Sequence, residues 1–330
     1  MARVTIYDVA NKAGVSIASV SRVLNTPEQV NEPLRGRVLA AIDELGFVPN
    51  AEATARARRT VQRIGVLAPF FTYPSFVQRL RGVAGVLASS PYELVVYTVD
   101  SMARRDGYLA SLPLHRRLDG LIIMSLAVED SAAQRLLSHG LETVLIEYHH
   151  PALSSIEIDD AAGGRLVGEL AVSGGHRRCA FVGDGDLPPY SLRPADARLA
   201  GYCQALNAAG VALPETAVIR AFPDAKRAYQ AAQLLLARPD PPTFVFCTSD
   251  VHAMGVLRAA RELGIAVPQQ LAVAGFDDLD VAEYIGLTTI RQPLDESGRI
   301  AANILLDRLA DRGRPVQRVM LPLTLQRRET

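Results

Sequence analysis

The N-terminal segment carries side chains that could contact a partner along one short helix. Ser16 is a suitable helix N-cap, and a helix is predicted from Ile17 to about Leu24. Val20, Val23 and Leu24 share one face of that helix. Residues at i, i+1, i+4 and i+5 form another face: Ile17, Ala18, Ser21 and Arg22. We expect the first face to pack on a core and the second to remain free.

Two further helices are expected to hold this one in place. Thr5 and Asp8 form a capping-box-like start to a first helix, and Gly14 permits a tight turn after it. The apolar face of the first helix is Ile6, Val9, Ala10 and Ala13. A third helix at about 32–45 directs four residues to the same core: Val38, Leu39, Ile42 and Leu45. The pattern matches a helix-turn-helix module, whose second helix enters a DNA major groove. The alternative is a structural three-helix appendage.

The rest of the chain alternates continuous apolar strands with amphipathic helices. Strands are predicted at 65–70, 93–99, 120–125, 143–148, 178–184, 243–247 and 271–277. Helices are predicted at 75–88, 162–172, 198–209, 225–236, 251–263 and 296–309. This alternation favours parallel sheets covered by helices on both faces, with too many units for one sheet. We therefore expect two doubly wound parallel-sheet subdomains.

Composition excludes several classes of protein. The chain has 330 residues, 49% hydrophobic and 21% charged, and no apolar run long enough to span a membrane. Its formal net charge is zero, so a polyanion would have to bind a local patch. The three cysteines are widely spaced, which favours a reducing cytoplasm, and the N-terminus has no signal-peptide pattern. Neither lysine, Lys12 or Lys226, follows a glycine, so a P-loop is absent.

No group of residues has the spacing of an enzyme or metal site. His149 and His150, or Asp277, Asp278 and Asp280, could suggest a metal, but their spacing fits neither a zinc nor an EF-hand site. Residues 183–186 lack the dinucleotide-binding pattern, and no nucleophile-elbow or zinc-protease motif occurs. We expect no enzyme activity, cofactor or metal.

The segment VTIYDVANKAGVSIASVSRVLN, with VLAAIDELGFVPN, resembles the headpiece of the lac repressor (LacI/GalR) family. The resemblance implies base reading by Ile17, Ala18 and Arg22, and Arg22 can pair with guanine O6 and N7. The resemblance also implies six residues that face DNA phosphates: Thr5, Tyr7, Ser16, Ser19, Ser21 and Asn25.

The basic segment after Pro49 corresponds to the hinge helix of that family, which inserts a leucine into the minor groove. Here the leucine position is Arg56, and the implied DNA contacts are Asn50, Ala53 and Arg56. A guanidinium fills a kinked base step less readily than leucine, so we expect a shallower central kink. The alternative is a solvated basic linker that touches only phosphates.

The resemblance extends to most of the chain, since TSDVHAMGVLRAARELGIAVPQQLAVAGFDDLD is similar to the distal half of the family's periplasmic-binding-protein-like core. It implies chain crossings between subdomains near 158, 288 and 321. The expected organisation is a headpiece (1–49), a hinge (50–62), an N-subdomain (63–158 and 289–320) and a C-subdomain (159–288 and 321–330).

In this family a small effector lies between the subdomains, at strand ends. Four clustered aromatic residues could stack on a sugar ring: Phe70, Phe71, Tyr73 and Phe76. Matching family positions supply the polar set: Glu147, Arg198, Ser249, Asp250, Asp277 and Gln292. For each polar residue, the alternative is a structural group at a strand end.

Together these features predict a homodimeric repressor of a carbohydrate-utilisation operon, acting on nucleoid DNA in a bacterial cytoplasm. It would be released from a pseudo-palindromic operator by a sugar-type effector. Two alternatives stay open: a corepressor-dependent regulator that responds to a nucleoside or purine-type ligand, and a solute-binding receptor without DNA function.

Overall fold

The computed structural model describes residues 4–25, 30–47, 62–185, 187–222 and 224–330, and the chain forms two compact units, Met1–Val61 and Gln62–Thr330. The first unit holds three helices among its described residues: α1 (Ile6–Ala13), α2 (Ile17–Asn25) and α3 (Glu32–Leu45). Gly14 ends α1 in the left-handed region at φ 64°, as the predicted tight turn requires.

The small core of this unit is as predicted except on α3. Val9, Ala10, Val20 and Val38 are buried together. Leu39, however, is 45% exposed, and Ala41 is buried instead. The inward face of α3 therefore repeats at Val38, Ala41, Ile42 and Leu45, and Leu39 lies one residue off that face.

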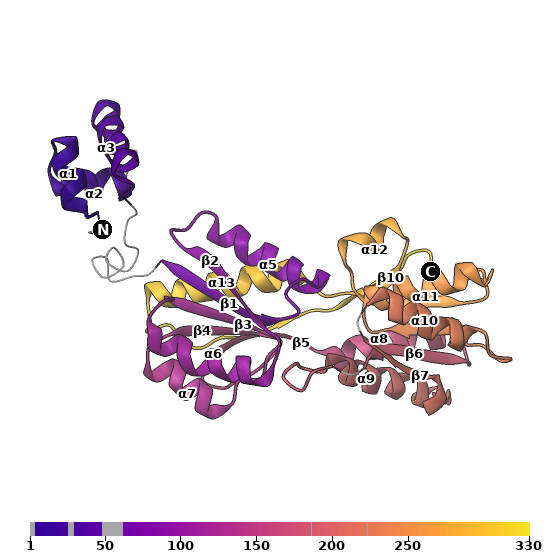
Figure 1. Ribbon diagram of the computed structural model, residues 1–330. Helices are drawn as coiled ribbons and strands as arrows, with labels where there is room; N and C mark the ends of the chain where they lie inside the picture. The colour runs from indigo at the N-terminus through magenta and orange to yellow at the C-terminus, as the bar shows by residue number, and fades with distance from the viewer. Residues whose placement is uncertain (1–3, 26–29, 48–61, 186, 223) are drawn as a thin grey trace. The chain divides into compact units, whose positions relative to one another are not determined.

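The second unit contains two six-stranded sheets (Figure 1). The first sheet has the order β11-β5-β4-β3-β1-β2, and all its neighbours are parallel. Its strands are β1 (Arg63–Pro69), β2 (Glu93–Val99), β3 (Gly120–Met124), β4 (Glu142–Ile146), β5 (Ser154–Ile158) and β11 (Arg318–Leu321). Its helices are α5 (Pro74–Leu87), α6 (Met102–His115), α7 (Asp130–Ser138) and α13 (Leu294–Ala310). Helices α5 and α13 cover one face, and α6 and α7 cover the other.

The second sheet has the order β12-β10-β9-β8-β6-β7, in which only β12 pairs antiparallel. Its strands are β6 (Cys179–Asp184), β7 (Val218–Ala221), β8 (Phe244–Cys247), β9 (Ala272–Asp277), β10 (Thr288–Arg291) and β12 (Thr324–Gln326). The helices of this half are α8 (Asp160–Ser173), α9 (Pro194–Ala208), η2 (Glu215–Ala217), α10 (Ala225–Leu236), α11 (Asp250–Glu262) and α12 (Asp280–Tyr284). Both sheets have buried strands and helices on both faces, so the predicted doubly wound pair is confirmed.

The chain passes between the sheets at three places, one of which differs from the prediction. β5 ends at Ile158, and β11 ends at Leu321, close to the expected positions. The crossing expected near 288 lies after Arg291, because β10 (Thr288–Arg291) pairs with β9 in the second sheet. Residues 289–291 therefore belong to the second sheet. We call the half built on the first sheet the N-subdomain and the half built on the second sheet the C-subdomain.

Candidate functional site

Helix α2 has the two faces that the sequence predicted. Val20 and Val23 are buried, whereas Ile17 is 40% exposed and Ala18 and Arg22 are also exposed. The Oγ of Ser16 accepts the backbone N–H of Ser19 at 3.1 Å, which caps the helix. The predicted base-reading residues thus lie together on the outside of a helix whose other side anchors it.

The start of α1 is fixed by a capping box. The backbone N–H of Thr5 donates to Asp8 Oδ2 at 2.8 Å, and the Thr5 hydroxyl donates to the same oxygen at 2.7 Å. The hydrogen bonds from Thr5 lower the pKa of Asp8. Tyr7 is 63% exposed beside this cap. Of the remaining candidates, Ser19 and Ser21 are partly exposed, and the side chain of Asn25 together with Asn50, Ala53 and Arg56 lies outside the described residues.

The second unit encloses a cavity of about 280 Å³ where strands of both sheets end. Eight of the ten predicted effector residues line it: Phe70, Tyr73, Phe76, Glu147, Arg198, Ser249, Asp277 and Gln292. They come from segments that are remote in sequence. This volume lies just below the range of small-molecule sites, about 300–1,000 Å³, so the cavity suits a ligand of monosaccharide or nucleobase size.

Four cavity residues adopt backbone angles that L-amino acids rarely adopt. Phe70, Ser125, Glu147 and Asp277 have φ values of 47°, 53°, 67° and 117°. All four stand at the carboxyl ends of sheet strands and line the cavity. Left-handed non-glycine residues cost free energy and cluster at ligand sites, so this geometry marks the strand ends as a functional region.

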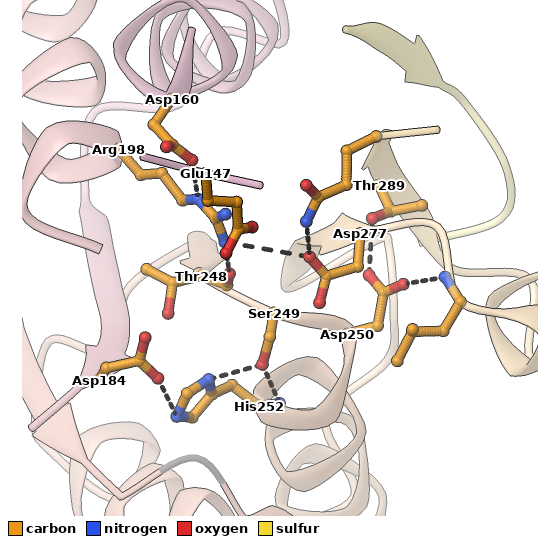
Figure 2. A network of polar contacts seen from close by, with 12 residues as sticks. Glu147, Asp160, Asp184, Arg198, Thr248, Ser249, Asp250, His252, Asp277 and Thr289 are labelled. Atoms are coloured by element: carbon orange, nitrogen blue, oxygen red, sulfur yellow. Dashed lines mark hydrogen bonds and ion pairs between the residues drawn. The ribbon is translucent and has the colours of Figure 1, made fainter. Parts of the chain in front are cut away.

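Arg198 is the centre of a buried polar network in the C-subdomain wall (Figure 2). It is 4% exposed; its Nε donates to Asp160 Oδ1 at 2.8 Å and its Nη1 to the Thr248 carbonyl at 2.6 Å. The guanidinium carbon lies 3.7 Å from the Phe276 ring centroid. Burial alone would lower the pKa of Arg198, but Asp160 and Asp277 outweigh it and raise that pKa. Arg198 therefore stays charged inside the protein.

The packing of α8 against α9 positions Arg198. A Cβ on Gly201 would lie 1.9 Å from the Ala161 carbonyl oxygen, and one on Gly164 would lie 1.9 Å from the Arg198 carbonyl oxygen. Both positions require glycine, because α8 and α9 touch backbone to backbone there. The close approach brings Asp160, at the start of α8, to the Arg198 guanidinium.

Asp277 faces Arg198 from the end of β9. Its Oδ1 lies 4.0 Å from Arg198 Nη1 and accepts a hydrogen bond from Gln292 Nε2. Burial raises the pKa of Asp277 to about 6, although Arg198 and Gln292 oppose the shift. The carboxylate is thus held ready to accept hydrogen bonds at neutral pH.

Arg79 is a cavity residue that the sequence reading missed. It is 3% exposed, it donates to Glu147, and its Nη2 donates to Gln292 Oε1 at 3.1 Å. Glu147 also accepts a hydrogen bond from the Ser125 hydroxyl. The available signal was an arginine three residues after Phe76, on the face of α5 that is buried.

Two predicted effector residues do not line the cavity. Phe71 packs against the core between α5, α13 and the first sheet. Asp250 is buried below the wall, where it accepts the Leu279 N–H at 2.7 Å and the Thr289 hydroxyl at 2.6 Å. Burial and the nearby Asp277 raise its pKa. Its two oxygens are used inside the protein, so we remove it and Phe71 from the effector set.

The aromatic part of the cavity is compact. The rings of Phe70 and Tyr73 stack with centroids 5.1 Å apart. Outside the cavity lining, Tyr190 and Phe222 of the C-subdomain lie near these rings, with centroids 6.4 Å from Phe70 and 6.5 Å from Tyr73. The aromatic lining thus comes from the N-subdomain, which also supplies Arg79, Ser125 and Glu147, whereas Arg198, Ser249 and Asp277 come from the C-subdomain.

Within the described residues, no group of three or more His, Cys, Asp or Glu side chains could hold a metal ion. A search of those same residues finds no helix both long and apolar enough to cross a membrane.

Comparison with known proteins gives the same architecture. A model of bacterial regulatory proteins of the lacI family matches residues 5–50, and one of periplasmic binding protein-like domains matches residues 169–330. The transcriptional repressor PurR of Erwinia tasmaniensis is 32% identical over 98% of this chain and 96% of its own length.

Solved structures agree. The lac repressor dimer bound to operator and the anti-inducer ONPF matches with a TM-score of 0.78 and 28% identity, covering 100% of this chain and 99% of that one. A complex of the regulator CelR with cellobiose matches with a TM-score of 0.70 and 31% identity, covering 99% of both chains.

A helix-turn-helix unit joined to a two-sheet core with a central cavity defines a DNA-binding transcriptional regulator. The chain belongs to the lacI family.

Proposed function

We propose that this protein represses a carbohydrate-utilisation operon and leaves its operator when a sugar-type effector fills the cavity. The observation that carries the proposal is the exposed face of α2, where Ile17, Ala18 and Arg22 stand clear of the headpiece core. Its site of action is the bacterial cytoplasm, where operator DNA lies.

Each side chain of the α2 face has a role in base reading. Arg22 suits a bidentate pair with guanine, and Ile17 and Ala18 suit contact with a thymine methyl. Phosphate contacts fall to Thr5, Tyr7, Ser16, Ser19, Ser21 and Asn25. We also propose that Asn50, Ala53 and Arg56 contact DNA and that Arg56 enters the minor groove, where arginine favours a narrow groove over a deep kink.

The cavity favours a sugar as effector. Stacked aromatic rings suit the apolar face of a sugar, and Arg198 and Asp277 can bind its hydroxyl groups. CelR binds cellobiose in its solved complex, which supports this class. The similarity to PurR supports the alternative, a nucleoside or purine-type corepressor. A ligand releases DNA or strengthens its binding according to the core state that it prefers.

We infer a homodimer, because a pseudo-palindromic operator is read by two symmetric headpieces. Large apolar residues are exposed on the surface of the second unit, on α5, β2, α11 and α12: Val77, Val96, Met254 and Tyr284. Arg81 of α5 pairs with Asp280 of α12 at 2.8 Å, so two of these elements adjoin across the subdomains. Exposed apolar residues on adjoining elements suit a second copy of the chain.

Selection of duplexes from a random pool, followed by gel shifts at several salt concentrations, tests the proposal. We expect a palindromic consensus and a steep loss of affinity with salt, since a dimer neutralises on the order of ten phosphates. A solute receptor without DNA function would select no sequence. A thermal-shift screen of sugars and nucleosides on the same preparation identifies the effector class.

A further inference from the structure

The serine cap of α11 is bonded to a buried histidine. Ser249 precedes α11 and lines the cavity, and its Oγ accepts the backbone N–H of His252 at 3.3 Å. The Nδ1 atom of His252 lies 2.8 Å from the same Oγ (Figure 2). The imidazole itself is fully buried. A titratable side chain outside the cavity therefore contacts a hydroxyl of the cavity wall.

The surroundings of the ring decide where its proton sits. Nε2 lies 3.3 Å from the carbonyl oxygen of Ala221 and 3.8 Å from Asp184 Oδ1. Both neighbours are acceptors, so Nε2 must carry hydrogen. A neutral imidazole has one N–H, which leaves Nδ1 as an acceptor. The Ser249 hydroxyl must then donate to Nδ1.

This arrangement leaves Ser249 with one kind of hydrogen bond to offer. A hydroxyl has one hydrogen and two lone pairs. The hydrogen points to His252 Nδ1, and one lone pair takes the His252 N–H. Only a lone pair remains for a cavity ligand, so the hydroxyl can accept a hydrogen bond but cannot donate one.

We propose that His252 fixes Ser249 as an acceptor in the cavity wall, so that the effector must place an O–H or N–H group against it. The inference rests on the proposed function, because it names the ligand chemistry of the same cavity. His252 acts as a positioning residue and does not touch the ligand.

The neighbouring wall strengthens the same preference. Asp277 and Asp184 present carboxylate oxygens, and Arg198 supplies the donors on this side. A phosphate or carboxylate at Ser249 would meet lone pairs without a hydrogen between them. The wall therefore suits an uncharged ligand rich in donors, such as a polyhydroxylated sugar.

Protonation of His252 would invert this preference. An imidazolium Nδ1–H would donate to Ser249 and free the hydroxyl hydrogen for the cavity. The charged groups that face the ring are Asp184 at the end of β6 and Asp224 at the start of α10. Burial lowers the pKa of His252 despite these carboxylates, so the acceptor state holds at neutral pH.

The proton position can be measured on the wild-type chain without a ligand. A two-bond ¹⁵N–¹H correlation spectrum of the histidine rings at pH 7.5 reports the tautomer, and loss of the signal in His252→Asn assigns it. We expect the Nε2–H form. An Nδ1–H form, or an imidazolium, would overturn the proposal.

Ligand discrimination is measured by calorimetry. The probes are D-ribose, D-glucose, D-galactose and cellobiose, together with deoxyfluoro derivatives of the tightest binder, whose fluorine cannot donate. In the wild type, the derivative with fluorine at the position that faces Ser249 should bind about tenfold or more weakly than the parent sugar, and we call this loss the penalty. His252→Asn retains an acceptor oxygen near the Nδ1 position and should keep that penalty. His252→Met frees the hydroxyl, so the penalty should fall below about threefold.

A matched control and the opposite outcomes complete the test. His176 has a similar bond to a hydroxyl, with Nδ1 at 3.0 Å from Thr243 Oγ1, and does not line the cavity. His176→Asn should leave discrimination unchanged. An equal penalty in wild type and His252→Met would refute the proposal. If no sugar binds, the sugar effector of the proposed function fails, while the wild-type tautomer still decides the role of His252.

Discussion

The exposed face of α2 and the polar wall of the cavity are built in opposite ways. The α2 face comes from one short stretch of sequence, and Ile17, Ala18 and Arg22 are exposed on it. The cavity wall joins distant segments, for example Arg79 and Gln292, which are 213 residues apart. Its polar groups are buried and bonded to one another.

This difference separates recognition from stability. Under the proposed function, removing a side chain from the α2 face should take away contacts with DNA and leave the headpiece core intact. Removing a side chain from the cavity wall leaves a buried polar or charged partner without its hydrogen bond. We therefore expect ligand binding and folding stability to be lost together. The variants below test that contrast, from the largest expected effect to the smallest.

Arg198→Ala should be the most harmful change. It leaves Asp160 and Asp277 buried without their cation, which we expect to lower the free energy of unfolding by about 3–5 kcal/mol. Urea denaturation measures the loss. Arg220→Ala is the control, because Arg220 pairs with Asp196 at 2.8 Å on the half-exposed surface and should contribute at most about 1 kcal/mol. Equal losses of unfolding free energy in the two variants would contradict the distinction between a buried ion pair and a surface ion pair.

Gly201→Ala tests the helix contact that positions Arg198. The new Cβ would lie 1.9 Å from the Ala161 carbonyl oxygen, so α8 and α9 must separate, at a cost of about 3 kcal/mol. Gly107→Ala in α6 is the matched control, because a Cβ there meets no atom within 4 Å. It should stabilise the protein by up to about 1 kcal/mol. Thermal and urea unfolding measure the difference in unfolding free energy between Gly201→Ala and Gly107→Ala. That difference would be smaller if α8 and α9 adjust freely.

Asp277→Asn should change how stability depends on pH. Burial raises the pKa of Asp277 to about 6 in the folded protein, above the unfolded value of about 3.9. The protonated carboxyl therefore stabilises the fold below about pH 4, and this contribution is lost as the pH rises through 6. Relative to Asp277→Asn, the wild type should lose up to about 3 kcal/mol between pH 4 and 7. Urea titrations with a pH-independent difference would contradict this.

Arg22→Ala should affect DNA binding alone. We expect operator affinity to fall by about 1–3 kcal/mol and preference to relax at one base pair of each half-site. Unfolding free energy should change by less than about 1 kcal/mol, because Arg22 is exposed. Gel shifts with single-base operator variants measure the first effect. A uniform loss on every variant would assign Arg22 to phosphate contact.

The same contrast explains what could be predicted from sequence. The headpiece follows from helix periodicity and capping, which are local, so the bounds of α3 and the two faces of α2 were predictable. The longer apolar strands were predictable for the same reason. Strands β5, β7, β11 and β12 were missed because polar residues interrupt or shorten their apolar runs, and residues 289–291 of β10 were placed in the wrong subdomain.

The cavity was predicted only where family positions or aromatic clustering marked it. Phe71 and Asp250 do not line the cavity, because neighbours along a chain leave a strand end in different directions. Arg79 and His252 were missed because their partners, Gln292, Glu147 and Asp184, become neighbours only after the sheets form. Sequence periodicity marks a buried face but does not pair the polar groups on it.

The central claim is that the cavity and the α2 face are thermodynamically coupled. The most direct measurement is the affinity of the purified protein for its selected operator, with and without the tightest-binding compound, together with the affinity of that compound with and without operator. We predict that each ligand changes the affinity for the other by one common factor of about 5 to 150. Operator affinity that is the same with the cavity filled and empty, or no preference for any duplex over competitor DNA, would contradict the account.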